Sequence, residues 1–242
     1  MFGTNPVRKQ SEMFRDDGSL RVQEIFATIQ GEGPYAGCPA TFVRLAGCNL
    51  RCSFCDTDFE SNFDNIMTIE EVFSAIMAVI PPTRLGAFGS GKELVVITGG
   101  EPLLQNVVPL IRRLRLEGIR CQIETAGTVW SDSLLVESIY QERDFFVCSP
   151  KTPKIHSQMA QRCFNWKYVV KSEGGVISTQ IHGHFHKALY LPPHSRHDRI
   201  YVQPCDEQNE EKNKANLAYA ISLCTKYGYQ LSLQTHKIMG LP

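Results

Sequence analysis

Short apolar runs and amphipathic stretches alternate along most of this chain. Runs rich in β-branched or alternating apolar residues predict strands at 22–29, 40–45, 93–98, 120–124, 145–148, 166–170, 199–203 and 229–233. Apolar positions at helical spacing predict helices at 68–80, 103–117, 131–140 and 206–227. Strands that alternate with helices predict an α/β fold built on a parallel sheet with crossover connections. About six such units fit an open or incomplete parallel β/α barrel.

The two ends of the predicted helices carry ordinary boundary signals. Thr68 with acids in the following turn starts the helix that Pro81 and Pro82 end, and Gly118 ends the next one. Residues 1–20 are polar, carry mixed charge and show no period, so we expect a flexible N-terminal extension before a single domain at 21–242. The longest apolar runs, at 75–80 and 94–97, are far shorter than the ~20 residues that span a bilayer.

Composition narrows the class of protein further. Lys plus Arg and Asp plus Glu are both 25, so no net charge favours a nucleic-acid partner. The nine cysteines are an odd number, and no apolar leader with a small-residue cleavage site precedes them. We therefore expect reduced thiols and a cytoplasmic protein, with no membrane segment.

Three of these cysteines lie within eight residues. Cys48, Cys52 and Cys55 form a C-x3-C-x2-C loop directly after the strand predicted at 40–45. Three thiolates can hold a [4Fe–4S] cube and leave its fourth iron open for chemistry. The alternative is a structural zinc site, which generally needs four ligands. Each of the other cysteines is isolated, which favours the cube.

A second motif, TGGEP at residues 98–102, ends another predicted strand. Two glycines let the backbone approach a ligand closely, although an ordinary strand-to-helix turn would have the same residues. Further polar segments follow other predicted strands, at 124–125, 149–151, 203–204 and 234–236. Because ligands gather at the carboxyl ends of parallel strands, these segments predict one shared site.

Together the cysteine loop and the glycine motif resemble the radical S-adenosylmethionine (SAM) superfamily. Within it, the chain is similar to the 7-carboxy-7-deazaguanine synthase family, and the similarity extends from residue 26 to the end of the chain. It rests on FATIQGEG (26–33), FVRLAGC (42–48), CDT (55–57), VITGGEP (96–102), QIET (122–125), SPK (149–151) and LQTHK (233–237).

The resemblance implies a lyase of the queuosine pathway. Such enzymes convert 6-carboxy-5,6,7,8-tetrahydropterin to 7-carboxy-7-deazaguanine and ammonia. A 5′-deoxyadenosyl radical abstracts the C6 hydrogen and the ring contracts. The implied cofactors are a [4Fe–4S] cluster, SAM and Mg2+, and the implied partners are a flavodoxin- or ferredoxin-like electron donor and a second copy of the chain in a homodimer.

The resemblance also implies roles for individual residues. Cys48, Cys52 and Cys55 would bind the cluster, and Thr57 would bind Mg2+. The residues implied to line the cofactor site are Phe54, Asp56, Gly100, Ser149, Pro150, Lys151, Gln203, Pro204, Cys205 and Asp206. Those implied to hold the pterin are Ile29, Gln30, Gly31, Arg44, Thr98 and, through the terminal carboxylate, Pro242.

Some of these assignments have alternatives on sequence grounds. Arg44 could bind a substrate carboxylate or form an internal ion pair with Glu32 or Glu124. Gln30 and Glu32 could contact the amide and amine edge of the pterin or order the 31–33 turn. Ala126 stands where relatives often carry Asn or Ser.

His182, His184 and His186 alternate along one segment, where they could hold a metal or be exposed loop residues. Two other functions stay open from sequence alone. One is a different small radical SAM enzyme, such as a glycyl-radical activase, and the other is a zinc-stabilised binding module without catalysis.

Overall fold

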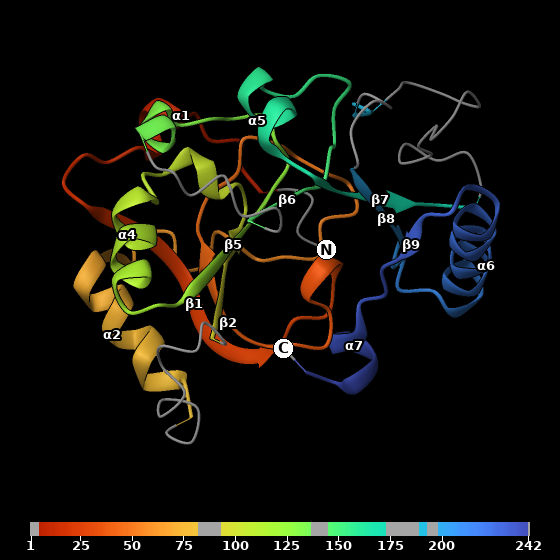
Figure 1. Cartoon of the computed structure of the whole chain (residues 1–242), viewed down its shortest axis with the longest axis horizontal. Helices are drawn as coiled ribbons and strands as arrows, with labels where there is room; N and C mark the ends of the chain where they lie inside the picture. Colours follow the sequence, from red (N-terminus) through yellow and green to blue (C-terminus); the bar gives the residue numbers. More distant parts are fainter. Residues whose placement is uncertain (1–4, 82–92, 137–144, 173–188, 193–197, 242) are drawn as a thin grey trace.

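The computed structural model of the chain describes residues 5–81, 93–136, 145–172, 189–192 and 198–241 (Figure 1). Within these residues one open sheet has the strand order β3-β1-β2-β4-β5-β6-β7-β8-β9. The strands are β1 (Ser19–Ile29), β2 (Pro39–Leu45), β3 (Ile66–Thr68), β4 (Leu94–Gly99), β5 (Arg120–Thr125), β6 (Phe146–Cys148), β7 (Asn165–Val170), β8 (Arg199–Pro204) and β9 (Gln230–Leu231).

The sheet is parallel from β2 to β9, which confirms the predicted fold class. The first strand differs, because β1 pairs antiparallel with both β2 and β3. The connection from β1 to β2 spans only residues 30–38, and a parallel crossover needs about a dozen residues or more. A short β1–β2 connection therefore turns the chain back on itself before the parallel units begin.

The helices partly follow the sequence prediction. They are α1 (Gln10–Met13), α2 (Ile69–Val79), α4 (Val108–Leu116), α5 (Ser157–Arg162), α6 (Glu210–Tyr227) and α7 (Thr235–Met239), with 3-10 turns η1 (Gly33–Tyr35), η2 (Pro102–Leu104) and η3 (Asp132–Val136). Thr68 caps α2 as expected and exchanges hydrogen bonds with Glu71. The helix expected at 131–140 is a 3-10 turn where it is described, and its last four residues lie outside the described residues.

The helix expected at 103–117 is split into η2 and α4. The buried Gln105 lies at the break, where its side chain bonds three backbone groups. Its Oε1 accepts from Arg21 N at 2.7 Å, and its Nε2 donates to Arg21 O at 3.1 Å and to Ala46 O at 3.0 Å. These tertiary hydrogen bonds outweigh local helical propensity, and they fix the start of α4 against β1 and the end of β2.

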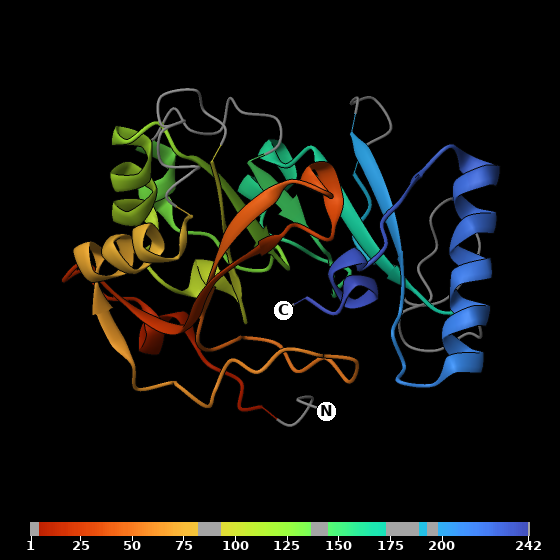
Figure 2. The ribbon, with the colours of Figure 1, turned by 90° about the horizontal axis from the view of Figure 1, so that it is seen from below.

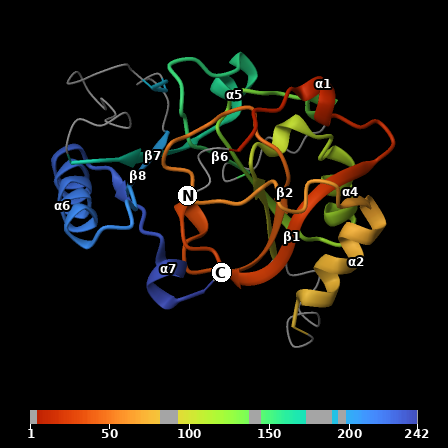
Figure 3. The same cartoon turned by 180° about the vertical axis from the view of Figure 1, so that it is seen from behind.

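The main core lies between the sheet and its covering helices. Ile76 of α2 and Ile111 of α4 are fully buried against strand residues such as Val95 and Ile97. Figure 3 shows α2 and α4 together near one end of the sheet and α6 at the other. Helices α2, α4 and α6 thus cover one face of the sheet, and the other face is left to the site described below.

The N-terminal residues are packed against the domain, in contrast to the flexible extension expected at 1–20. Val7 forms a parallel bridge with Cys48, and Arg8 N donates to Cys48 O at 2.7 Å. Met13 is fully buried against Gly47, where an added Cβ would lie 2.6 Å from its methyl group. Residues 5–20 show no periodic apolar pattern, but a few apolar contacts and hydrogen bonds to the cysteine loop are enough to order them.

The C-terminal segment lies inside the curve of the sheet. Figure 2 shows α7 between the β1–β2 end and β8. Thr235 anchors it, because its backbone N and its Oγ1 donate to Gly31 O at 3.4 and 3.2 Å. No helix in the described residues is long and apolar enough to cross a membrane.

Candidate active site

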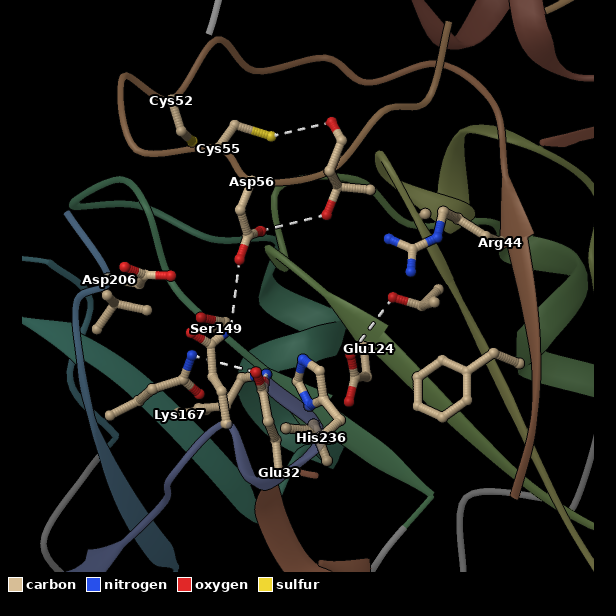
Figure 4. Close-up of a pocket in the computed structure, with 18 of the residues that line it drawn as sticks. Glu32, Arg44, Cys52, Cys55, Asp56, Glu124, Ser149, Lys167, Asp206 and His236 are labelled. Carbon is tan, nitrogen blue, oxygen red and sulfur yellow. Dashed lines mark hydrogen bonds and ion pairs between the residues drawn. The ribbon is translucent and has the colours of Figure 1, made fainter. Parts of the chain in front are cut away.

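A cavity of about 440 Å³ opens at the carboxyl ends of the strands, within the ~300–1,000 Å³ typical of small-ligand sites. It is bordered by β1, β2, β4, β5, β6, β7 and β8, by the cysteine loop and by α7. Figure 4 shows Cys52 and Cys55 on one side of the cavity and Glu32, Lys167 and His236 on the other. The shared site expected at the strand ends is therefore one continuous cavity.

The three cysteines of the loop all line this cavity. Burial raises the pKa of Cys48 to about 12, and it raises the pKa values of Cys52 and Cys55 as well. Leu50 N lies 3.4 Å from Cys48 Sγ and donates a hydrogen bond to it. A bound metal would replace the thiol protons and make three thiolates of these groups.

The arrangement of these thiols fits a cube better than a single ion. In the described part of the chain, no three His, Cys, Asp or Glu side chains converge closely enough to hold one metal ion. A tetrahedral zinc site needs such convergence, whereas a cube takes each thiolate on a different iron. Three thiols that line one cavity are suited to a cluster with one iron open.

The glycine motif contacts the cysteine loop directly. A Cβ on Gly99 would lie 2.1 Å from Leu45 O, and one on Gly100 would lie 2.1 Å from Gly47 O and 2.9 Å from Cys48 Cβ. Gly99 also has a φ of +134°, which disfavours residues with side chains. Only glycines allow the end of β4 to lie this close to the backbone that carries Cys48.

The glutamate of the same motif has a structural role. Glu101 is fully buried, and its carboxylate accepts from Leu103 N at 3.1 Å, Thr125 Oγ1 at 2.7 Å and Ala126 N at 2.8 Å. Burial raises its pKa despite these donors. Glu101 thus connects the loop after β4 to the loop after β5 through hydrogen bonds, one of which comes from the backbone of Ala126.

The loop that follows the cysteines is tied to α7. Lys237 Nζ lies 2.7 Å from Asp56 Oδ2 and 3.1 Å from Asp206 Oδ2, and Gln234 Nε2 donates to Asp56 at 3.3 Å. Burial opposes ionisation of Asp56, but the hydrogen bond and charge of Lys237 still lower its pKa. These contacts hold two acids at the cavity next to the cysteines.

Other implied cofactor residues also meet the cavity. Lys151 Nζ donates to Ser149 Oγ and lies 5.6 Å from the centre of the Phe54 ring. Burial lowers the pKa of Lys151, as does the charge of Lys167. Among the residues that the structure describes, none donates a hydrogen bond to the buried Gln203 Oε1, and Gln203 lines the cavity, so this oxygen is an acceptor that a ligand can use.

A second group of polar side chains lies toward β1, β2 and β5. Gln30 Nε2 donates to Glu124 Oε1 at 3.0 Å, and Thr98 Oγ1 lies 3.3 Å from Glu124 Oε2. Arg44 forms its ion pair with Glu24, at 2.7 Å, instead of with Glu32 or Glu124. Arg44 still lines the cavity, so it can meet an anion there.

Most of the residues implied by sequence line the cavity. Gly31 and Pro150 are not among the lining residues. Gly31 lies behind the lining residue His236, because an added Cβ would be 2.1 Å from His236 Nδ1. Pro242, His182, His184 and His186 lie outside the described residues.

The sequence-based set omitted several lining residues: Glu124, Lys167, Gln234, His236 and Lys237. On sequence grounds Glu124 is a possible ion-pair partner of Arg44, and both Glu124 and the 234–237 segment lie in stretches that carry the family resemblance, but the sequence assigns none of them an individual role in the site. Lys167 had one recognisable signal, since it is the one charged residue within the β7 sequence NWKYVV. A charge inside a buried strand needs a partner, which indicates a functional or structural network.

Comparison with known proteins agrees with this geometry. Residues 43–153 match the Radical SAM superfamily profile. The crystal structure of QueE from Escherichia coli has a TM-score of 0.59 at 22% identity, and the match covers 93% of this chain and 98% of that one. This likeness supports a shared fold, the partial barrel.

Three similar sequences are named 7-carboxy-7-deazaguanine synthase. That of Rhodospirillum rubrum is 39% identical over the full length of both chains. That of Rickettsia prowazekii is 34% identical over 100% of this chain and 96% of its own, and that of Hyperthermus butylicus is 33% identical over 92% and 94%. Identity at this level over whole chains shows descent from one family, and the chain belongs to the 7-carboxy-7-deazaguanine synthase family.

Proposed function

We propose that this chain is a radical SAM lyase that converts 6-carboxy-5,6,7,8-tetrahydropterin to 7-carboxy-7-deazaguanine and ammonia, in the route to queuosine. The observation that carries the proposal is the single cavity in which Cys48, Cys52 and Cys55 meet the polar groups of β1, β2 and β5. A cluster and a substrate held on opposite sides of one cavity are close enough to react.

The cluster and SAM, when bound, supply a carbon-centred radical that removes a hydrogen atom from the substrate. The residues of the chain bind the cluster and SAM, orient the pterin and shield both from water. Cys48, Cys52 and Cys55 would hold the cluster, and the backbone at Gly100 would approach the methionine end of SAM. Asp56, Asp206 and the free acceptor on Gln203 would hold the rest of the cofactor on the same side.

The pterin would lie on the opposite side. Arg44 supplies a guanidinium for the substrate carboxylate, and Gln30, Glu32 and Glu124 supply acceptors and a donor for the amide and amine edge. Ile29 and Thr98 would complete this wall, and α7 covers it. Enclosure between the sheet and α7 limits the access of water to a reactive substrate.

The direct test is turnover. Anaerobically reconstituted protein is incubated with SAM, a reductant, Mg2+ and the carboxytetrahydropterin, and products are identified by mass spectrometry. The proposal expects 7-carboxy-7-deazaguanine and an equal amount of ammonia. Fully cluster-loaded protein that cleaves SAM but leaves the pterin unchanged would point to a different substrate and reject the proposal.

Substitution of Gly31 by alanine is expected to weaken pterin binding more than SAM binding. The new Cβ would lie 2.1 Å from His236 Nδ1 and 3.0 Å from His236 N, so the pterin wall formed by α7 must shift. Overpacking of this kind costs about 1–3 kcal/mol, which corresponds to a rise of about 5- to 160-fold in the KM for the pterin if the whole cost falls on binding.

Gly228→Ala is the control for Gly31→Ala, because nothing lies within 4 Å of its added Cβ and the strain from its φ of +71° is confined to the end of α6, away from the cavity. Steady-state kinetics with each substrate varied separately provide the measurement. A Gly31→Ala enzyme with an unchanged KM for the pterin would place the pterin away from His236.

Substitution of Thr57 by valine is expected to abolish the stimulation by Mg2+. Thr57 lines the cavity next to Asp56, and Mg2+ binds oxygen ligands while it keeps several waters or substrate oxygens. Valine has the same shape without the oxygen, whereas Thr57→Ser keeps the hydroxyl and should keep the stimulation. The measurement is the rate over a Mg2+ titration in the wild type, Thr57→Val and Thr57→Ser. Equal stimulation in all three would show that Mg2+ does not bind the Thr57 hydroxyl.

The proposal extends to the partners of the enzyme. Reduction of the cluster needs one electron at low potential, for which a flavodoxin- or ferredoxin-like protein is the donor that we propose. We also propose a cytoplasmic location, since reduced thiols and an iron–sulfur cluster need a reducing compartment. The family resemblance is the basis on which we propose a homodimer.

A further inference from the structure

Lys167 projects from β7 into the cavity and pairs there with Glu32. Its Nζ contacts Glu32 Oε2, and the two side chains are only 8% and 11% exposed. Gln203 Nε2 donates to the other carboxylate oxygen, Glu32 Oε1, at 3.2 Å. Both ends of the Glu32 carboxylate are therefore fixed by residues from β7 and β8, and Figure 4 shows Lys167 and Glu32 side by side.

We propose that Lys167 is a positioning residue for the pterin, which keeps the Glu32 carboxylate ionised and oriented toward the substrate. This inference rests on the proposed function, because it takes Glu32 as one of the groups that meet the amide and amine edge of the pterin. That edge presents N–H donors, and only an ionised carboxylate offers acceptors at both oxygens.

The surroundings of Glu32 show why the lysine is needed. The electrostatic surroundings of the pair include Lys151 after β6 and His236 on α7, which act on Glu32, and Glu124 on β5 and Asp56 after the cysteines, which act on Lys167. Two of these are acids, and burial lowers the pKa of His236, which makes that ring a poor source of positive charge. The ammonium of Lys167 is the cation in direct contact.

The energetic consequence follows from burial. A carboxylate buried without a partner takes up a proton instead of remaining charged. Burial does oppose ionisation of Glu32, but the charge of Lys167 outweighs it and lowers the pKa. Burial likewise opposes the charge on Lys167, yet Glu124 and Glu32 raise its pKa above the ordinary range. The pair is thus charged, and the loss of Lys167 would remove the charge that outweighs burial and would shift Glu32 toward its protonated form.

The test is equilibrium binding of the carboxytetrahydropterin to cluster-loaded protein with SAM and without reductant, so that no turnover occurs. The dissociation constant is measured between about pH 6 and pH 9 for the wild type, Lys167→Met, Lys167→Arg and Glu32→Gln. We expect a Kd about 30-fold or more higher in Lys167→Met at neutral pH. That Kd should fall as pH rises, because Glu32 then ionises without its partner.

The other variants separate positioning from a structural role. Lys167→Arg keeps the charge and should restore most of the affinity and the flat pH dependence of the wild type. Glu32→Gln should bind weakly at every pH. Lys171→Met breaks a Lys–Glu pair directly after the same strand, with Glu207 at 2.8 Å, and should leave the pterin Kd and its pH dependence unchanged.

Lys167→Gln, which removes the charge but retains a hydrogen-bond donor, replaces Lys167→Met if that variant does not fold. A pterin Kd within about twofold of wild type in both uncharged variants would overturn the inference. A loss of affinity that is the same at every pH and that arginine does not restore would also overturn it. Failure of the proposed function looks different, because wild-type protein would then not bind the pterin at all.

Discussion

Cys48→Ala is expected to abolish both cluster assembly and SAM cleavage. Alanine keeps the Cβ that packs against Gly100 but removes one of three sulfurs. Loss of the partners that merely orient metal ligands costs about 10–100-fold in affinity or activity, so loss of a ligand should cost more than about 100-fold. Iron content, visible absorbance and 5′-deoxyadenosine formation after anaerobic reconstitution measure the effect.

The same loss is expected for Cys52→Ala and Cys55→Ala, which line the same cavity. Cys224→Ser is the matched control, because Cys224 lies on α6, away from the cavity. It should assemble a cluster and cleave SAM like the wild type. Full iron content and SAM cleavage in any of the three alanine variants would contradict the assignment of the cluster ligands.

Gly100→Ala is expected to lower SAM affinity by about tenfold or more and to destabilise the fold by about 1–3 kcal/mol. The added Cβ would meet Gly47 O at 2.1 Å and Cys48 Cβ at 2.9 Å. These atoms belong to the backbone and to a cluster ligand, so no flexible side chain can move aside. Equilibrium binding of SAM and denaturant unfolding provide the two measurements.

Gly18→Ala separates the site from general strain. Gly18 has a φ of +73° with nothing within 4 Å of an added Cβ, so alanine costs about 1–2 kcal/mol of conformational strain without a clash. It should bind SAM normally. Normal SAM affinity in Gly100→Ala would contradict the close approach of β4 to the cysteine loop in the working enzyme.

The parallel part of the fold could be predicted because its strands are short, β-branched and bounded by turns. The ends of β4, β5 and β8 also indicated where the site lies, since ligands gather at the carboxyl ends of parallel strands. The antiparallel pairing of β1 was not predictable from apolar patterning, which does not fix the direction of a neighbour. Nor was the break before α4, where Gln105 bonds three backbone groups from distant segments.

The site was predictable as far as its motifs extend. Cys48, Cys52, Cys55 and Gly100 come from compact motifs whose spacing reflects the chemistry. Lys167 belongs to no motif and Lys237 ends the LQTHK segment, but the role of each depends on a partner far away in sequence, Glu32 and Asp56 respectively. Such pairs are fixed by tertiary structure, so a single sequence shows at most that a charge lies in a buried strand.

Mössbauer spectroscopy can show directly whether the three cysteines hold a cube with one open iron, in anaerobic protein reconstituted with the Mössbauer-active iron isotope and recorded before and after addition of SAM. We expect a four-iron cube in which one iron changes its signal when SAM is added while the other three do not. A protein that holds zinc without a cube, or a cube that does not respond to SAM, would contradict it.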